Sequence, residues 1–189
     1  MAARSIGILA LQGDFEAHRK ALERAGARVV EVRTAEELER VDGLVIPGGE
    51  SSTMLKLLRE ENLIEPLRRF GERRPIFGTC AGAILLARHV TRPAQESLGL
   101  MDLDVERNAY GRQLASHVAQ LEETEGGPLE AVFIRAPIVR RVGPGVRVLA
   151  RYNGDPVLVE QGLHMAATFH PELTDDSRVH RWFLGKVAA

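Results

Sequence analysis

The one cysteine of the chain lies between two glycines, in residues 78–82 (GTCAG), after the apolar run Pro75–Phe77. Glycines two residues before and two after a nucleophile let a chain turn sharply from a strand into a helix. Such a turn holds the side chain above the sheet edge in a strained conformation. The positive end of the following helix favours the thiolate. The pattern predicts that Cys80 is a nucleophile; a small buried core cysteine is the alternative.

A histidine and a glutamate at the far end of the chain are the expected partners of this cysteine. Residues 169–172 (FHPE) follow an apolar run that reads as a strand up to Phe169. Pro171 biases His170 towards an extended conformation, and residues two apart in an extended chain face the same side. Glu172 would then accept the imidazole N–H, as in a catalytic triad. The alternative is a strand end with two solvated polar residues.

A glycine pair follows another apolar run, in residues 47–53 (PGGESST) after 44–46. Paired glycines allow a turn that presents backbone N–H groups to a ligand. The carboxyl end of a strand is also where α/β sheets bind ligands. The backbone N–H of Ala81 would point to where an oxyanion forms. The alternative is a simple strand-to-helix turn capped by Ser51.

The first half of the chain alternates between apolar runs and helical patterns. Phe15, His18, Leu22 and Ala25 recur at helical spacing, and Thr34 to Glu37 has a capping-box pattern. This alternation predicts a parallel sheet with helical crossovers. The expected strands are residues 5–11, 29–32, 44–46 and 75–77; the expected helices are 14–25, one from 34, one after 51, 63–70 and 81–88.

The pattern changes after about Gly99, where strands with short turns follow one another. Asn153-Gly154 is a strong hairpin signal. These strands are expected at residues 103–107, 116–121, 131–134, 146–152, 156–161 and 163–169, before a last helix at 175–187. We therefore expect an α/β sandwich with antiparallel strands in its second half, formed by one domain over residues 1–189.

Composition excludes several classes of protein. Lys plus Arg number 25 and Asp plus Glu number 26, so charge gives no reason to expect nucleic acid or an anionic membrane as partner. No apolar stretch approaches the roughly 20 residues that span a bilayer, and no secretory pattern opens the chain, so a cytosolic location is expected. A single cysteine excludes an intrachain disulfide and a cysteine-based zinc site.

Together these motifs resemble a known family. Residues 11–13 (LQG), 47–53, 77–82 (FGTCAG), 105–113 (VERNAYGRQ), 133–137 (FIRAP) and 169–174 (FHPELT) resemble the glutaminase subunits of pyridoxal 5′-phosphate synthase, which are class I glutamine amidotransferases. The matches run from residue 6 to about 184. The resemblance implies a three-layer, flavodoxin-like α/β fold with a mostly parallel central sheet.

The resemblance also assigns roles to residues. Cys80, His170 and Glu172 match the catalytic triad. Without the resemblance, Arg107 and Arg135 would read as ordinary surface arginines. The positions that match glutamine-binding residues are Gly49, Glu50, Ser51, Arg107, Ile134 and Arg135, and those that match the oxyanion hole are Gly49 and Ala81.

The implied activity is hydrolysis of L-glutamine to L-glutamate and ammonia through a γ-glutamyl thioester, with no cofactor and no metal. The implied partner is the (β/α)₈ synthase subunit, which builds pyridoxal 5′-phosphate from ribose 5-phosphate and glyceraldehyde 3-phosphate. Docking is expected to activate the glutaminase, and Gln12 is placed where it can sense the partner. Departures at 109–110, 114–115 and 90–98 bear on the docking surface.

Two alternatives stay open. One is a glutaminase subunit with another acceptor, such as that of imidazole glycerol phosphate synthase, which only the choice of partner separates. The other is a non-catalytic module in which Cys80 is a redox sensor or a structural thiol.

Overall fold

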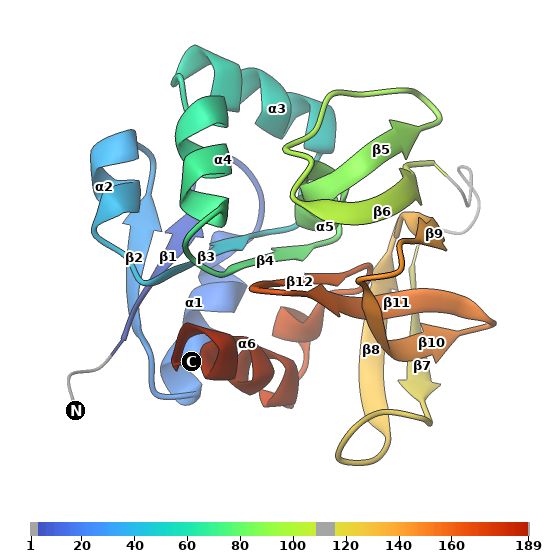
Figure 1. The fold of residues 1–189 in the computed structure, drawn as a ribbon. Coiled ribbons are helices and arrows are strands. Elements are labelled where there is room, and N and C mark those ends of the chain that lie inside the picture. The colour runs from blue at the N-terminus through green and yellow to red at the C-terminus, as the bar shows by residue number, and fades with distance from the viewer. Residues whose placement is uncertain (1–3, 109–115, 189) are drawn as a thin grey trace.

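A seven-stranded sheet forms the middle of the molecule, in the order β10-β11-β12-β4-β3-β1-β2 (Figure 1). The computed structural model describes residues 4–108 and 116–188. Strands β1 to β4 and β12 pair in parallel, whereas β10 and β11 pair antiparallel. The strands of this sheet are β1 Ser5–Leu9, β2 Arg28–Val32, β3 Gly43–Ile46, β4 Ile76–Thr79, β10 Arg147–Tyr152, β11 Asp155–Gln161 and β12 His164–Ala167.

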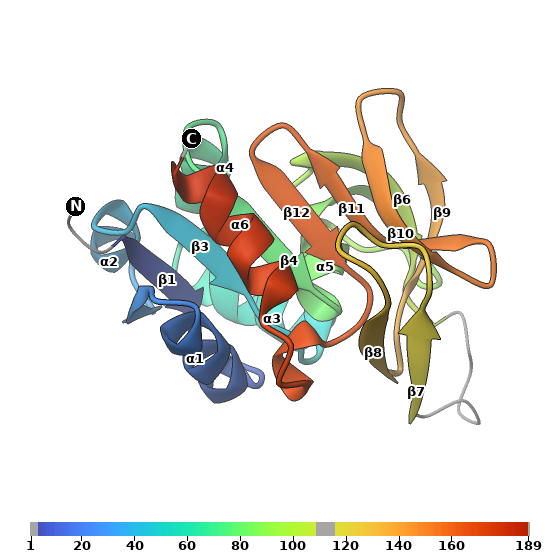
Figure 2. The ribbon, with the colours of Figure 1, turned by 90° about the horizontal axis from the view of Figure 1, so that it is seen from below.

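Helices cover both faces of this sheet and make the expected three layers. Figures 1 and 2 show α1 (Phe15–Arg24) and α6 (Arg178–Ala188) on one face. The opposite face carries α2 Ala35–Glu39, α3 Ser51–Glu60, α4 Ile64–Gly71 and α5 Ala81–Leu86. The predicted α/β sandwich with a mostly parallel central sheet is confirmed.

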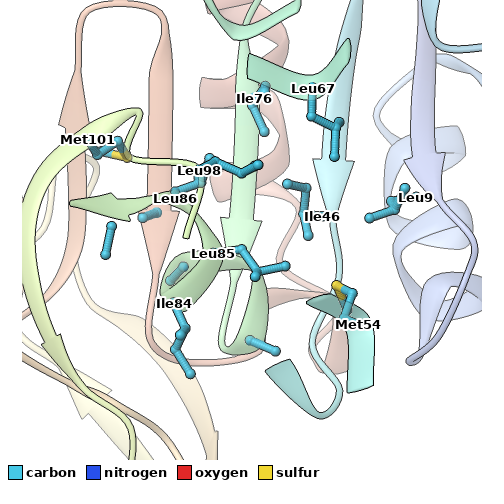
Figure 3. Packing of buried hydrophobic residues seen from close by; sticks show 14 of the residues in the cluster. Leu9, Ile46, Met54, Leu67, Ile76, Ile84, Leu85, Leu86, Leu98 and Met101 are labelled. Carbon is cyan, nitrogen blue, oxygen red and sulfur yellow. The ribbon is translucent and has the colours of Figure 1, made fainter. Parts of the chain in front are cut away.

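Each face of the sheet has its own apolar core. Leu9, Ile46 and Ile76 of the sheet pack against Met54 of α3 and Leu67 of α4 (Figure 3). On the other face, side chains of the sheet pack against the apolar stripes of α1 and α6, which include Leu22 and Phe183. Burial of these stripes is the main source of stability for such short helices.

The second half of the chain does not simply extend the central sheet. Strand β12 pairs antiparallel with β11, as expected, and on its other side pairs in parallel with β4 of the first half. A three-stranded sheet, β5 Ala87–Thr91, β6 Met101–Glu106 and β9 Ile138–Val142, and a hairpin, β7 Ser116–Leu121 and β8 Leu129–Ile134, stand apart from it. Of the pairings that the described residues make in these two sheets, only that of β6 with β9 joins strands that are not consecutive in sequence.

The prediction of a helix over residues 81–88 is wrong at its end. The backbone of Ala87 is extended, with ψ of 153°, and Ala87 pairs with Met101 of β6. Strands β5 and β9 were not predicted. Each has two adjacent polar residues in the middle of five, ARHVT and IVRRV, so neither is an apolar run nor a strict alternation that would predict a strand.

Local signals gave mixed results. The capping box at Thr34 and Glu37 is confirmed, as is the Asn153-Gly154 hairpin, where both residues have positive φ. The alternative in which Ser51 caps α3 is not found: Glu50, not Ser51, accepts the N–H of Thr53. The Ser51 hydroxyl instead donates to Gln95 Oε1 at 3.3 Å.

No helix within residues 4–108 and 116–188 is long and apolar enough to cross a membrane.

Candidate active site

Parallel strands bring the predicted site residues to one edge of the sheet. The loops that follow β1, β3, β4 and β12 carry Gln12, Gly49, Cys80 and His170, respectively. Because these strands are neighbours and run in the same direction, their carboxyl ends meet at the same edge. The fold therefore gathers residues from both ends of the chain.

Cys80 occupies a strained elbow between β4 and α5. Its φ of 50° lies in the left-handed region, and its N–H donates to Ala167 O of β12 at 2.9 Å. A Cβ on Gly82 would lie 2.1 Å from Ile46 O, and one on Gly78 would lie 2.5 Å from Gly82 O. The flanking glycines are thus needed for the close packing of α5 on the sheet, and the predicted strained turn is confirmed.

His170 and Glu172 lie together, although the backbone between them is not the extended one that the sequence predicted. His170 Nδ1 lies 2.7 Å from Glu172 Oε1. Pro171–Leu173 form one turn of 3₁₀-helix, and β12 already ends at Ala167. The turn folds Glu172 back onto the ring, while His170 N–H donates to Val132 O of β8 at 2.8 Å.

The electrostatics of the pair favour an imidazolium. Burial acts to lower the pKa of His170, but Cys80 and Glu172 outweigh it and raise the pKa to about 10. Burial acts to raise the pKa of Glu172, but the facing histidines, His18 and His170, hold it below its ordinary value. His170 Nε2 is buried and has no hydrogen bond of ordinary geometry to the described residues, which leaves it open to exchange a proton with the thiol.

A cavity of about 280 Å³ opens onto these groups. Cys80 is 7% exposed and His170 is 9% exposed, so both are shielded but reach the cavity. Water-poor surroundings strengthen the interactions of charged groups. The cavity is lined by Asp14, Gly48, Gly49, Cys80, Ile134, Arg135, His170 and Leu173.

Glu50, in the loop after β3, forms an ion pair with Arg107, and neither residue is part of the cavity lining. Arg107 Nη2 lies 3.1 Å from Glu50 Oε1, and the other oxygen of Glu50 accepts the N–H of Thr53 at 2.7 Å. Burial opposes the charge of Glu50, but hydrogen bonds from Ser52 and Thr53 lower its pKa to about 2. The carboxylate is therefore a fixed negative charge.

The remaining predicted residues divide into two groups. Gly49, Ile134 and Arg135 line the cavity, and Arg135 has a positive φ of 44°. Ser51 is buried and bonds to Gln95, outside the cavity lining. Ala81 is the first residue of α5, where a helix has no partner for its N–H.

Sequence reasoning missed Asp14, Gly48 and Leu173 as lining residues. Gly48 and Leu173 lie inside the motifs at 47–53 and 169–174, and Asp14 directly follows the motif at 11–13, so the motifs themselves were the available signal. A Cβ on Gly48 would lie 2.5 Å from His170 Cε1, so only glycine leaves room for the ring. Gln12 Oε1 accepts the N–H of Glu50 at 3.0 Å and so joins the loop after β1 to the loop after β3.

Two further histidines lie behind Glu172. His18 of α1 and His180 of α6 are fully buried, with His18 Nδ1 3.0 Å from His180 Nε2. Burial lowers the pKa of both, to about 3 for His180. Each is therefore neutral in the folded chain at neutral pH.

These buried histidines predict a loss of stability in acid. The folded pKa of His180 is below the unfolded value of 6.5, so the unfolded chain binds the proton first as pH falls. The free energy of unfolding should fall below pH 6.5 by about 1.4 kcal/mol per pH unit for each such histidine. Urea unfolding measured between pH 7 and pH 5 should show that the free energy of unfolding falls less steeply with falling pH in His180→Leu than in the wild type. Equal slopes in the two proteins would contradict this.

Among the described residues, no group of three or more His, Cys, Asp or Glu side chains is arranged to hold a metal ion.

Comparison with known proteins gives a consistent set of relatives. The chain is 61% identical over 97% of its length to the whole of a protein named pyridoxal 5′-phosphate synthase subunit PdxT from Solibacter usitatus. It is 53% identical over 95% of its length to 95% of the protein of that name from Thermus thermophilus.

A solved glutamine amidotransferase superimposes with a TM-score of 0.92 at 49% identity, covering 97% of this chain and 99% of that one. A chain in the structure of PurLQS from Thermotoga maritima shares the fold, with a TM-score of 0.69 at 16% identity and coverage of 100% and 96%. The family model described as SNO glutamine amidotransferase matches residues 8–189. The chain belongs to the SNO glutamine amidotransferase family.

Proposed function

We propose that this chain, as one glutaminase domain over residues 1–189, hydrolyses L-glutamine and supplies the ammonia to pyridoxal 5′-phosphate synthase. The observation that carries the proposal is the alignment of a thiol, an imidazole and a carboxylate beside a cavity. It occurs in a chain 61% identical to a protein named as a subunit of that synthase.

The proposed catalytic residues are Cys80, His170 and Glu172. The thiolate of Cys80 attacks the side-chain amide carbon of glutamine, and the C=O π electrons move to oxygen. As the tetrahedral intermediate collapses, the imidazolium of His170 protonates the departing nitrogen, which leaves as ammonia. Water then attacks the γ-glutamyl thioester, His170 takes its proton, and the sulfur departs from glutamate. Glu172 keeps His170 in the tautomer that this requires.

The oxyanion is proposed to be held by the backbone N–H groups of Gly49 and Ala81. Ala81 is the first residue of α5, so its N–H has no partner within the helix and lies at the positive end of the helix dipole. Losing one such donor typically costs roughly 10²–10³ in rate.

The α-amino and α-carboxylate groups of glutamine are proposed to bind at the rim of the cavity. The fixed carboxylate of Glu50 suits an ammonium group, and arginine side chains suit a carboxylate. The residues proposed for this role are Gly49, Glu50, Ser51, Arg107, Ile134 and Arg135.

Arg107→Ala should therefore weaken binding more than chemistry. It removes a charge from the substrate rim and frees Glu50, so KM for glutamine should rise about tenfold or more while kcat stays within about threefold. Steady-state assays of glutamate release measure both. Arg73→Ala, which breaks an exposed ion pair with Glu39, is the matched control. An unchanged KM for Arg107→Ala would remove Arg107 from the site.

The choice of partner is tested by product formation. Glutamate release should be stimulated by the (β/α)₈ synthase subunit, and the mixture with glutamine, ribose 5-phosphate and glyceraldehyde 3-phosphate should accumulate pyridoxal 5′-phosphate, followed by its absorbance. The synthase partner of imidazole glycerol phosphate synthase should give no stimulation. Stimulation by that partner alone would overturn the assignment, and no glutamate release with either would favour a non-catalytic module.

A further inference from the structure

The carboxylate of Glu172 has a second oxygen that the triad does not use. Oε1 accepts from His170, whereas Oε2 lies 3.4 Å from His18 Nε2 of α1. Both side chains are almost completely buried, at 1% and 0% exposure. A buried carboxylate oxygen without a donor is costly, so the nature of this contact matters to the triad.

His18 is itself held on both ring nitrogens. Nδ1 lies 3.0 Å from His180 Nε2 of α6, and Nε2 lies 3.0 Å from Thr79 Oγ1, one residue before the nucleophile. All three residues are fully buried. The chain of contacts thus runs from α6 through α1 to Glu172 and meets β4 beside Cys80.

The contacts favour one placement of the protons over the other. If His18 carried its proton on Nδ1, the lone pair of Nε2 would face a carboxylate oxygen and repel it. His180 would then carry its proton on Nδ1, which has no hydrogen-bond partner among the described residues. With both protons on Nε2, His180 donates to His18, and the single Nε2–H of His18 is shared between Thr79 Oγ1 at 3.0 Å and Glu172 Oε2 at 3.4 Å. Glu172 Oε2 has no other donor among the described residues, and the unpaired His180 Nδ1 is only a lone pair.

We propose that His18, held by His180 and Thr79, is a positioning residue that donates its Nε2–H to Glu172 and fixes the carboxylate that orients His170. The inference rests on the proposed function, because it concerns the same triad. His18 is not among the residues that line the cavity; it acts through Glu172. The triad is then extended by a buried relay, from Glu172 to His18 and from His18 to His180 of α6.

The charged groups around His18 are compatible with a neutral donor. Glu172 attracts and His170 repels a proton on His18, Asp14 attracts one, and Arg24 acts on His180 in the repelling sense. Burial opposes a charge on either ring. A neutral His18 still donates one N–H, which is all the relay needs.

The test compares two substitutions in the complex with the synthase subunit. His18→Leu removes the donor, whereas the amide of His18→Gln restores an N–H close to the Nε2 position. We expect kcat to fall about tenfold to a hundredfold in His18→Leu, the range for losing one hydrogen bond to a charged group, with KM unchanged. His18→Gln should recover most of the rate. His164→Leu, which removes a buried imidazole that accepts the N–H of Ile76, controls for loss of any buried histidine.

The pH profile separates positioning from general destabilisation. Without the His18 donor, ionised Glu172 is less stable and protonates at higher pH, so the acidic limb of kcat/KM should move to higher pH in His18→Leu and return in His18→Gln. Equal kcat values and equal pH profiles of kcat/KM for the wild type, His18→Leu and His18→Gln would overturn the proposed role of His18. A wild type that releases no glutamate would instead overturn the proposed function.

A second measurement determines the tautomers in the wild-type protein and uses two variants only to assign the signals. Two-bond ¹⁵N–¹H correlation spectra distinguish the tautomers of neutral histidine, and the signals of His18 and His180 are assigned by their loss in the His18→Gln and His180→Gln proteins. Both residues should carry the proton on Nε2. A proton on Nδ1 of His18 would overturn the proposal even if His18→Leu failed to fold.

Discussion

Replacing Cys80 by alanine is expected to lower glutamine hydrolysis by about 10⁴-fold or more, because no other group at the cavity can form the thioester. The only sulfur nucleophile is removed, while the backbone of the elbow is retained. Glutamate release in the complex with the synthase subunit measures the loss.

An ammonia supply provides the control for this prediction. The Cys80→Ala complex should still form pyridoxal 5′-phosphate when ammonium salt replaces glutamine, since the synthase subunit is intact. Failure with both nitrogen sources would mean that the variant disrupts the complex. Glutamate release within tenfold of wild type would contradict a nucleophilic Cys80.

Glu172→Gln is expected to lower kcat by roughly 10³–10⁴-fold, with the fold retained. The amide keeps the shape of the carboxylate but can no longer hold the Nδ1 proton of His170 or stabilise the imidazolium. The pKa of His170, raised to about 10 partly by this carboxylate, should fall. Steady-state kinetics and circular dichroism test the rate and the fold.

The matched control is Glu160→Gln, which breaks ion pairs with Arg147 and Lys186 outside the cavity. Its kcat should equal that of the wild type. A Glu172→Gln protein with more than a tenth of wild-type activity would show that the carboxylate is not needed to orient the imidazole.

Much of the site could be predicted because its signals are local. Gly78 and Gly82 are needed because a side chain at either position would collide with neighbouring backbone. Because this requirement is common to sharp strand-to-helix turns, the two glycines predict the turn from sequence. His170 and Glu172 were paired correctly because they are two residues apart, even though a 3₁₀ turn rather than an extended chain joins them. Their closeness in sequence was enough to predict the pair, although the predicted extended backbone was wrong.

What could not be predicted depends on contacts between distant segments. Helical spacing placed His18 on the buried stripe of α1, but its partner is 162 residues away on α6. Strand β9 pairs with β6 across another long separation, and nothing in its sequence marks that register. Glu50 caps α3 with one carboxylate oxygen and pairs through the other with Arg107, which also lies far along the chain.

Chemical trapping of the nucleophile identifies the residue that attacks glutamine. The complex with the synthase subunit is incubated with a glutamine analogue that carries an electrophile at the γ-position, digested, and analysed by mass spectrometry. We predict one adduct, on the peptide that contains Cys80. It should form more slowly when glutamine competes and should be absent in Cys80→Ala. An unmodified Cys80 in a complex that still releases glutamate would contradict it.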